Sequence, residues 1–243
     1  MIVWLASYPR SGNTYYRLLL HHLYGQCTYS QYNDALFMEM GAQGIIGHEQ
    51  LPAPLSELDG EARLYFVKTH DLPVDHRPAI CLVRDGRDVM VSFARYNKTY
   101  APNQPDRASN PQPVDAETFS TSLRKLITVS KQFGGWSRNV LSWLSRDRGA
   151  GLVVVRYEDL LRDPAGELVR SLGVLNISFE RGGGALPSFE ELHRRWPEFF
   201  RKGKTGSWRE EMTDELHELF WQHHGDAMRA LGYAQEPALQ TMH

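Results

Sequence analysis

Four short segments bring cationic, hydroxyl and imidazole side chains together at spacings that suit the binding of an anion. The first is Ser7-Tyr8-Pro9-Arg10-Ser11-Gly12-Asn13-Thr14, which follows an apolar run and precedes residues with helical spacing. Such a loop places backbone amides at a helix N-terminus beside a cation and two hydroxyl groups, and this combination binds phosphate or sulfate. A simple helix cap, with Ser11 or Asn13 as the capping residue, explains the same segment about equally well.

The same loop lacks the pattern of a Walker A phosphate loop. Gly12 is followed by Asn13 where that pattern has Lys, and no other glycine precedes Gly12 in the chain. Nucleoside triphosphatases, which use the Walker lysine to hold the β- and γ-phosphates of the nucleotide, are therefore disfavoured.

Two further segments carry cations. Arg84-Asp85-Gly86-Arg87-Asp88 lies between a second apolar run and a helical stretch, and Ser92 follows about one helical turn into that stretch. Arg84 and Ser92 are suitably spaced to grip one phosphate group, although local ion pairs within the segment explain its charges when it is taken alone. Arg201-Lys202-Gly203 offers two cations beside a glycine, where the backbone can approach a ligand closely; a solvated basic loop is the alternative.

The fourth segment, Lys68-Thr69-His70, ends another apolar run. Side chains alternate along a strand, so Lys68 and His70 face the same side and present a cation and a titratable imidazole together. A lone histidine is more often structural than catalytic, and the position of His70 at the carboxyl end of a strand is what singles it out. By contrast, we expect four histidines to be helix-surface residues: His21, His22, His223 and His224.

The elements that must position these segments alternate along the chain. Hydrophobic spacing predicts strands at Ile2–Ser7, Arg63–Lys68, Ala79–Val83 and Gly151–Tyr157, and helices at Thr14–Tyr24, Val89–Tyr96, Phe119–Ser145 with a break at Gly134-Gly135, and Pro164–Leu172. Parallel strands need crossover helices, so this order predicts an α/β fold with a mainly parallel sheet flanked by helices on both faces. Its N-terminal strand-loop-helix is P-loop-like, and the length of 243 residues fits a single domain over residues 1–243.

Two segments fall outside this alternation. Residues 97–115 contain four prolines among Asn, Gln and Asp, which is too polar for a core element and predicts a mobile loop. Residues 189–231 are polar with helical spacing and no clear linker before them. We expect this C-terminal helical segment to pack on the same core.

Composition and charge exclude several classes of protein. The formal net charge of −2 leaves no global basic field, so we do not expect nucleic acid as a partner. The apolar start Ile2–Ala6 has no basic residues before it and is too short for a signal peptide or a membrane span, so no membrane association is expected. Cys27 and Cys81 lie far apart in sequence and form no metal-ligand pattern, which fits a reducing, cytoplasmic setting.

Taken together and in this order, the four segments resemble the PAPS-dependent sulfotransferase family, whose donor is 3′-phosphoadenosine 5′-phosphosulfate (PAPS). The similarity runs from about Ile2 to about Trp208, with a divergent middle. The first segment is similar to the family's 5′-phosphosulfate loop, Tyr-Pro-Lys-Ser-Gly-Thr-Thr-Trp, with Arg, Asn and Tyr replacing Lys, the first Thr and Trp. The resemblance implies donor contacts for Arg10, Ser11, Gly12, Asn13, Thr14 and, on the adenine, Tyr15.

The resemblance extends to the other segments. Arg84 and Ser92 match the residues that bind the donor's 3′-phosphate, and Arg201-Lys202-Gly203 matches the start of the family's Arg-Lys-Gly-x-x-Gly-Asp-Trp element, which completes that clamp. Lys68-Thr69-His70 matches the family's Lys-Thr-His, in which the lysine touches the transferring group and the histidine is the base. Tyr157 matches a tyrosine on the adenine side.

What the resemblance implies is a sulfuryl transfer from PAPS to a hydroxyl or amine of a small-molecule acceptor, with release of 3′,5′-adenosine bisphosphate (PAP). His70 takes the acceptor proton while Lys68 and Arg10 offset charge on the leaving group, so we expect turnover without a metal. The loop at 97–115 follows the 3′-phosphate segment, where related enzymes have acceptor-gating segments. The acceptor itself stays open among phenols, alcohols, amines, sugars and peptides.

Two other functions fit parts of the pattern. A small-molecule or nucleoside kinase also needs a phosphate loop and cationic lid residues, but the Walker lysine and a Mg²⁺ ligand pattern are missing. A PAP- or PAPS-binding protein without transferase activity needs the phosphate sites but not His70. The oligomeric state is open, because the family's dimer motif is only partly matched around Asp214, which replaces a valine.

Overall fold

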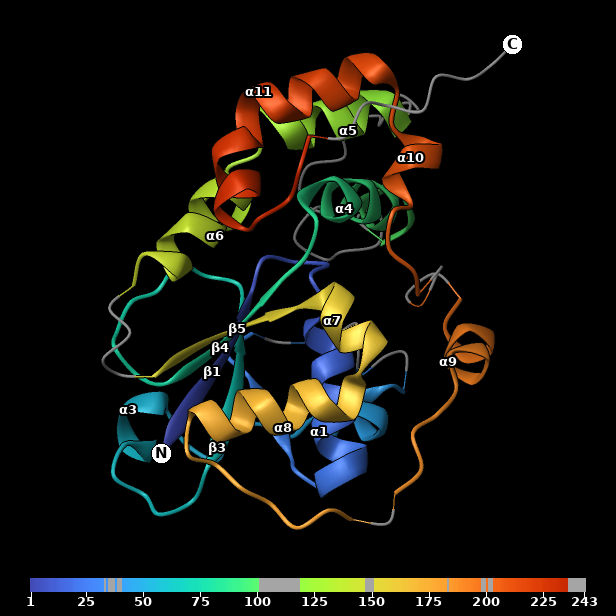
Figure 1. Ribbon diagram of the computed structural model, residues 1–243. Helices are drawn as coiled ribbons and strands as arrows, with labels where there is room; N and C mark the ends of the chain where they lie inside the picture. Colours follow the sequence, from blue (N-terminus) through green and yellow to red (C-terminus); the bar gives the residue numbers. More distant parts are fainter. Residues whose placement is uncertain are drawn as a thin grey trace, which may run out of the picture. The chain divides into compact units, whose positions relative to one another are not determined.

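The computed structural model describes residues 1–32, 34, 38, 41–100, 119–146, 151–182, 184–197, 200 and 203–235, without the side chains of 97–100. The chain divides into two compact units: Met1–Arg84 with Asn139–Ser188, and Asp85–Arg138 with Phe189–His243. Each unit therefore combines two separated stretches of the chain, and neither is a contiguous stretch of sequence (Figure 1).

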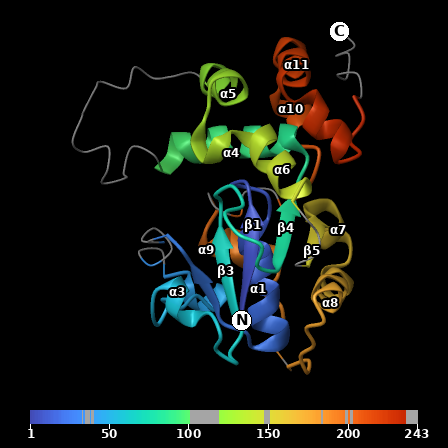
Figure 2. The same ribbon diagram turned by 90° about the vertical axis from the view of Figure 1, so that its left-hand side faces the viewer.

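The first unit is built on a five-stranded parallel sheet in the order β2-β3-β1-β4-β5. Its strands are β1 (Ile2–Ser7), β2 (Thr28–Ser30), β3 (Tyr65–Thr69), β4 (Ala79–Val83) and β5 (Leu152–Arg156). β1 lies in the middle, paired with β3 and β4, as Figure 2 shows. All six of its residues are buried, which explains why an uninterrupted apolar run, rather than an alternating one, marks this strand in the sequence.

Helices flank this sheet. They are α1 (Asn13–Tyr24), α3 (Leu55–Leu58), α7 (Tyr157–Arg162) and α8 (Pro164–Val174), with a 3₁₀ turn at Gln43–Ile46. α8 starts where the sequence dictates, because the Asp163 side chain accepts a hydrogen bond from the amide of Gly166 and Pro164 occupies the first turn. α1 packs against β1 and α8. The expected α/β fold with a parallel sheet flanked by helices is confirmed.

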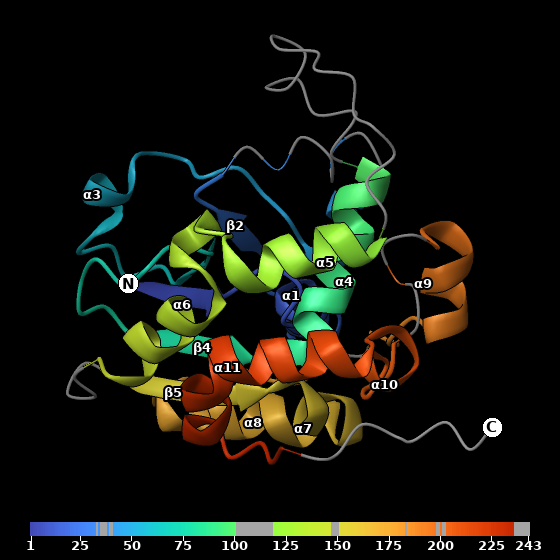
Figure 3. The same ribbon diagram turned by 90° about the horizontal axis from the view of Figure 1, so that it is seen from above.

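The second unit is helical in its described part. It contains α4 (Gly86–Tyr100), α5 (Phe119–Thr128), α9 (Phe189–Arg195), α10 (Trp208–Glu211) and α11 (Asp214–Ala230), with a 3₁₀ turn at Gln132–Gly134; α6 (Trp136–Leu144) is divided between the two units. α4, α5 and α11 pack against one another (Figure 3). At the start of α4, a Cβ on Gly86 would lie 2.5 Å from the ring of Trp136, so close packing demands glycine there.

Several sequence expectations differ from the structure. Three short elements, β2, α3 and α7, were not predicted; Tyr157, expected at the end of a strand, begins α7 instead. α4 continues to Tyr100, so residues 97–100 of the expected mobile loop are helical, because no helix breaker occurs before Pro102. The rest of that loop, 101–115, lies outside the described residues. None of the described helices is both long and apolar enough to cross a membrane.

Candidate functional site

The sheet order determines where the first unit can bind a ligand. From β1 the chain continues through α1 to β2 on one side of the sheet, whereas from β4 it continues toward β5 on the other side. The loops after the adjacent strands β1 and β4 therefore lead toward opposite edges of the sheet. Ligands of open parallel sheets bind in the crevice at the carboxyl ends of such a strand pair. Arg10 follows β1 and Arg84 follows β4, so the topology brings two predicted site residues to this place.

The loop between β1 and α1 has a backbone suited to an anion. Arg10 has φ of 71° and Gly12 has φ of 102°, both in the left-handed region. Gly12 is the N-cap of α1, and no side chain caps the helix. The first amides of α1 are therefore not bonded to a capping side chain, which is the arrangement that holds phosphate or sulfate at helix N-termini. The alternative of Ser11 or Asn13 as an ordinary cap is not what the structure has.

Asn13 braces this loop from the inside. Its side-chain amide is buried and donates hydrogen bonds to the carbonyl oxygen of Leu5 at 2.8 Å and to Oγ of Ser7 at 3.2 Å. The side chain of Asn13 therefore fixes the loop to β1.

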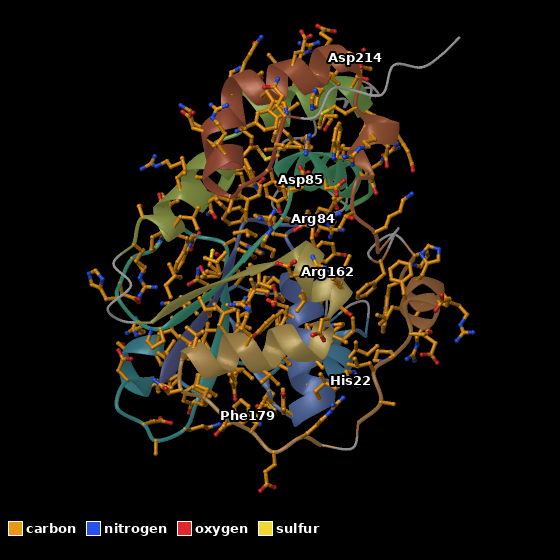
Figure 4. The ribbon with its side chains drawn as sticks, viewed as in Figure 1. His22, Arg84, Asp85, Arg162, Phe179 and Asp214 are labelled. Carbon is orange, nitrogen blue, oxygen red and sulfur yellow. The ribbon has the colours of Figure 1, made fainter. Side chains whose placement is uncertain are left out.

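Tyr157 and Arg84 close over the loop. A Cβ on Gly12 would lie 2.6 Å from Cδ2 of Tyr157, so the tyrosine ring lies directly on the glycine. The guanidinium of Arg84 lies 4.5 Å from the centroid of the same ring, and its Nη1 donates to the carbonyl oxygen of Arg10 at 3.3 Å. Figure 4 labels Arg84 at the end of β4. Burial, and then the neighbouring Tyr157, raise the pKa of Tyr15, which places Tyr15 in the same group.

Lys68 and His70 stand at the carboxyl end of β3, next to β1. Lys68 pairs with Leu5 across the sheet, and its side chain, 12% exposed, forms an ion pair with Asp34 at 2.9 Å. The ring of His70 stacks on Tyr32 with centroids 5.7 Å apart. Its backbone is also held, because the amide donates to the hydroxyl of Tyr32 and the carbonyl accepts from the side chain of Asn139.

The hydrogen bonds of His70 define its tautomer. Nδ1 lies 2.8 Å from the carbonyl oxygen of Ser7, which can only accept, so Nδ1 carries the proton of the neutral ring. Burial, and then the charge of Lys68, lower the pKa of His70 to about 3. The imidazole is therefore neutral at physiological pH, with Nε2 as the atom that accepts a proton. A neutral ring can accept a proton, although a pKa this far below neutrality makes it a weak base in the protein without nucleotide.

The remaining predicted residues belong to the second unit. Ser92 lies on α4 and Gly203 precedes α10, whereas Arg201 and Lys202 lie outside the described residues. Gly203 has φ of 56°, and a Cβ there would lie 2.3 Å from the ring of Phe189, so glycine is required at this point of the loop. The contribution of these four residues to the site stays a prediction.

Sequence reasoning missed Asp88, the residue that holds the loop between Gly203 and α10. The Asp88 carboxylate accepts hydrogen bonds from the amides of Gly206 at 2.7 Å and Trp208 at 3.0 Å, which ties the loop to α4. The neighbouring Arg87 pairs with Asp85 at 2.7 Å and lies 3.9 Å from the ring centroid of Trp208. The local ion pair considered for this segment is thus present, but it involves Arg87, while Arg84 lies on Tyr157. No sequence signal connects Asp88 with residues 118 or more positions away.

Among the described residues, no group of three or more His, Cys, Asp or Glu side chains is arranged to hold a metal ion. The two cysteines, Cys27 and Cys81, are both unpaired. The expectation of metal-independent turnover stays a prediction.

A family model for the sulfotransferase domain matches residues 2–196. The chain belongs to the sulfotransferase family. It is accordingly a PAPS-dependent transferase. Human sulfotransferase 1E1 is 25% identical over 255 residues, which cover 93% of this chain and 83% of the relative. Rat sulfotransferase 1 family member D1 is 25% identical over 251 residues, covering 89% and 79%.

Solved structures share the fold of this sulfotransferase. Mouse sulfotransferase SULT7A1 complexed with PAP superimposes with a TM-score of 0.62 at 20% identity, covering 96% of this chain and 89% of that one. Retinol dehydratase in a complex with retinol and PAP gives a TM-score of 0.60 at 17% identity, covering 94% and 81%. The expected P-loop-like α/β fold is confirmed by both.

Proposed function

We propose that this sulfotransferase moves a sulfuryl group from PAPS to a hydroxyl, or an amine, of a small acceptor and releases PAP. The loop Arg10–Thr14 and the N-terminus of α1 receive the 5′-phosphosulfate, because that end of the donor carries the charge that backbone amides and a cation favour. Tyr15 and Tyr157 provide the aromatic surface for adenine, and Arg84 binds the 3′-phosphate with Ser92, Arg201, Lys202 and Gly203.

In the transfer step, Nε2 of His70 takes the proton of the acceptor hydroxyl as its oxygen attacks sulfur. The new sulfur–oxygen bond forms as the bond between sulfur and the 5′-phosphate oxygen breaks, and the electron pair of that bond stays on the phosphate. Lys68, Arg10 and the loop amides offset the charge that grows there. Because these groups interact most strongly with the charged leaving group, they stabilise the transition state more than the bound donor.

The observation that carries this proposal is the placement of His70 beside Lys68 and the loop after β1. A neutral imidazole whose Nδ1 is bound to the Ser7 carbonyl stands two residues from the Lys68 ammonium, at the sheet edge that also holds the phosphate loop. A binding protein without transferase activity has no need for a neutral imidazole fixed in this tautomer. We include the small-molecule acceptor, the cytoplasmic location and the independence from metal in the same proposal.

The test is a transfer assay with PAPS and a panel of phenols, alcohols and amines in the presence of EDTA, with PAP formation followed by chromatography. The wild type should form PAP and a sulfated product in equal amounts. His70→Gln should lower kcat by about 10²- to 10⁴-fold, which is the contribution of a general base. Equal PAP formation by wild type and His70→Gln would contradict the proposed role of His70.

A further inference from the structure

The side chains behind Lys68 form a buried charged network that the transfer step described above does not use. Arg17 lies on α1 and its side chain is fully buried. Its Nε donates to Oγ1 of Thr28 at 2.8 Å, and its Nη2 lies 2.9 Å from Nδ1 of His48. Its Nη1 pairs with Oδ2 of Asp34 at 3.5 Å. The guanidinium is thus fixed on several sides, one turn beyond the phosphate loop.

Asp34 connects this fixed guanidinium with the lysine at the site. Its Oδ1 accepts from Nζ of Lys68 at 2.9 Å, and its side chain is 8% exposed. Since its two oxygens face two different cations, Asp34 has a defined orientation. The contacts run from Arg17 on α1 through Asp34, after β2, to Lys68 near the end of β3, and so they link α1 to the strand that precedes His70.

The charges around Lys68 explain why its ion pair with Asp34 affects its protonation. Burial lowers the pKa of Lys68, and Asp34 opposes that effect, while Arg17 reinforces it. Burial favours a protonated Asp34, but Lys68 and then Arg17 overcome this and lower its pKa. The other titratable groups around Lys68 are His70, which follows β3, His48, whose pKa burial and Arg17 lower, and Tyr32. The ring centroid of Tyr32 lies 5.7 Å from Nζ of Lys68, and burial raises the pKa of its hydroxyl, which keeps it neutral. Among these described neighbours, Asp34 is the anion that favours the charged form of Lys68.

We propose that Asp34, anchored by Arg17, is a positioning residue that keeps Lys68 protonated and directed at the leaving group of sulfuryl transfer. This inference rests on the proposed function. It adds a carboxylate that acts through Lys68, and it gives a reason for the fully buried Arg17 on α1. Losing the carboxylate leaves Lys68 buried beside Arg17 without its counter-charge, which favours the neutral amine.

The kinetic test uses Asp34→Asn with PAPS and an aliphatic alcohol acceptor, whose hydroxyl does not titrate in the range measured. We expect kcat to fall by about tenfold or more, with KM for PAPS changed less than about threefold. The basic limb of the kcat profile should move to lower pH, because less alkali is needed to deprotonate Lys68 when Asp34 is gone. Asp34→Glu should return the basic limb toward its wild-type position.

A control variant and the melting temperature separate this role from a structural one. Asp226→Asn removes the carboxylate of another cation pair, the exposed Arg229–Asp226 pair on α11, and should leave both kcat and the pH profile unchanged. A merely structural Asp34 would lower the melting temperature and kcat at every pH without moving the basic limb. That result would overturn the proposal. If Asp34→Asn fails to fold, Asp34→Ser provides a second neutral variant with room for water.

A labelling experiment needs neither donor nor acceptor. Trace acetylation with acetic anhydride between pH 6 and 11, read by mass spectrometry, gives the pKa of Lys68 in the wild type and in the neutral variant. The pKa should be lower in the variant; equal values would overturn the proposal. If the wild type neither binds PAP nor transfers sulfate, the proposed function fails, while this titration still decides whether Asp34 controls the protonation of Lys68.

Discussion

At the end of β3, burial lowers the pKa of both Lys68 and His70. The group that each side chain faces then favours one protonation state. Lys68 faces the carboxylate of Asp34, which favours the ammonium form. His70 faces the carbonyl of Ser7, which binds the proton of Nδ1 and leaves Nε2 as the basic atom. A cation and a neutral imidazole thereby stand two residues apart, and the proposed sulfuryl transfer uses both.

The first prediction concerns the protonation of His70 in the protein without nucleotide. Because the pKa of His70 is about 3, its imidazole should keep the neutral Nδ1–H form from pH 8 down to pH 5. Long-range ¹⁵N–¹H NMR of the imidazole distinguishes the two tautomers and the protonated ring, and His70→Gln assigns the signal. A midpoint near 6.5, the usual value for histidine, would contradict this account.

The sequence was most informative for residues within one short segment. Lys68 and His70 were predicted from alternation along a strand, and Arg84 from its place after β4. Asp34 and Asp88 were not predicted, because their partners lie far away in sequence, and a single carboxylate in a loop has no pattern of its own. His224 was predicted wrongly: it is 8% exposed, bonded to Ser137 and Ile127, and not a helix-surface residue.

At the scale of elements, the loop between β1 and α1 depends on how closely other residues approach its backbone. The ring of Tyr157, at the start of α7, lies on Gly12 and also carries Arg84. A side chain at position 12 would have to displace that ring. It would also require a positive φ, which residues with a side chain rarely adopt. Glycine is therefore needed at position 12 for the close approach of the Tyr157 ring as well as for the φ of 102°.

Gly12→Ala should therefore weaken PAP binding by about tenfold or more and lower the melting temperature. The matched control is Gly25→Ala at the other end of α1, where φ is also positive, 64°, but no atom lies within 4 Å of the added Cβ. That variant should lose stability, by about 1–2 kcal/mol, with PAP affinity unchanged. Calorimetric titration and thermal unfolding measure both quantities. Equal PAP affinity in the two variants would mean that the contact with Tyr157 does not shape the site.

Element boundaries followed the strength of the local pattern. The predicted limits of β1 and β4 agree with the structure, because both are fully buried and end at polar loop residues. β2 has three residues and α7 has six, too few to produce a recognisable period. The parallel order of the sheet followed from strand-helix alternation, whereas the order β2-β3-β1-β4-β5 depends on tertiary packing that spacing does not encode.

At the scale of the whole molecule, buried neutral histidines make stability depend on pH. Burial lowers the pKa of His224 to about 4, and Nε2 of His224 lies 3.0 Å from the carbonyl oxygen of Ile127, as expected for the neutral ring. His70 has an even lower pKa. In the unfolded chain both titrate near 6.5, so between that pH and their folded values the unfolded state binds more protons.

Stability should accordingly be fully present above pH 6.5 and should fall as the pH drops toward 4. Urea denaturation at a series of pH values, followed by tryptophan fluorescence, measures this fall. The double variant His70→Gln, His224→Gln should show a flatter dependence between pH 6.5 and 4.5 than the wild type. Identical slopes would mean that these two histidines do not titrate on unfolding.

The measurement that tests the central claim most directly is calorimetric titration of the wild type and Arg84→Ala with PAP, beside adenosine 5′-monophosphate and ATP with Mg²⁺. It needs no acceptor. We predict selective binding of PAP, weakened about 10- to 100-fold by Arg84→Ala, because a charged hydrogen-bonding partner of the 3′-phosphate is lost. Preference for ATP with Mg²⁺, or PAP binding that does not depend on Arg84, would contradict the site described here.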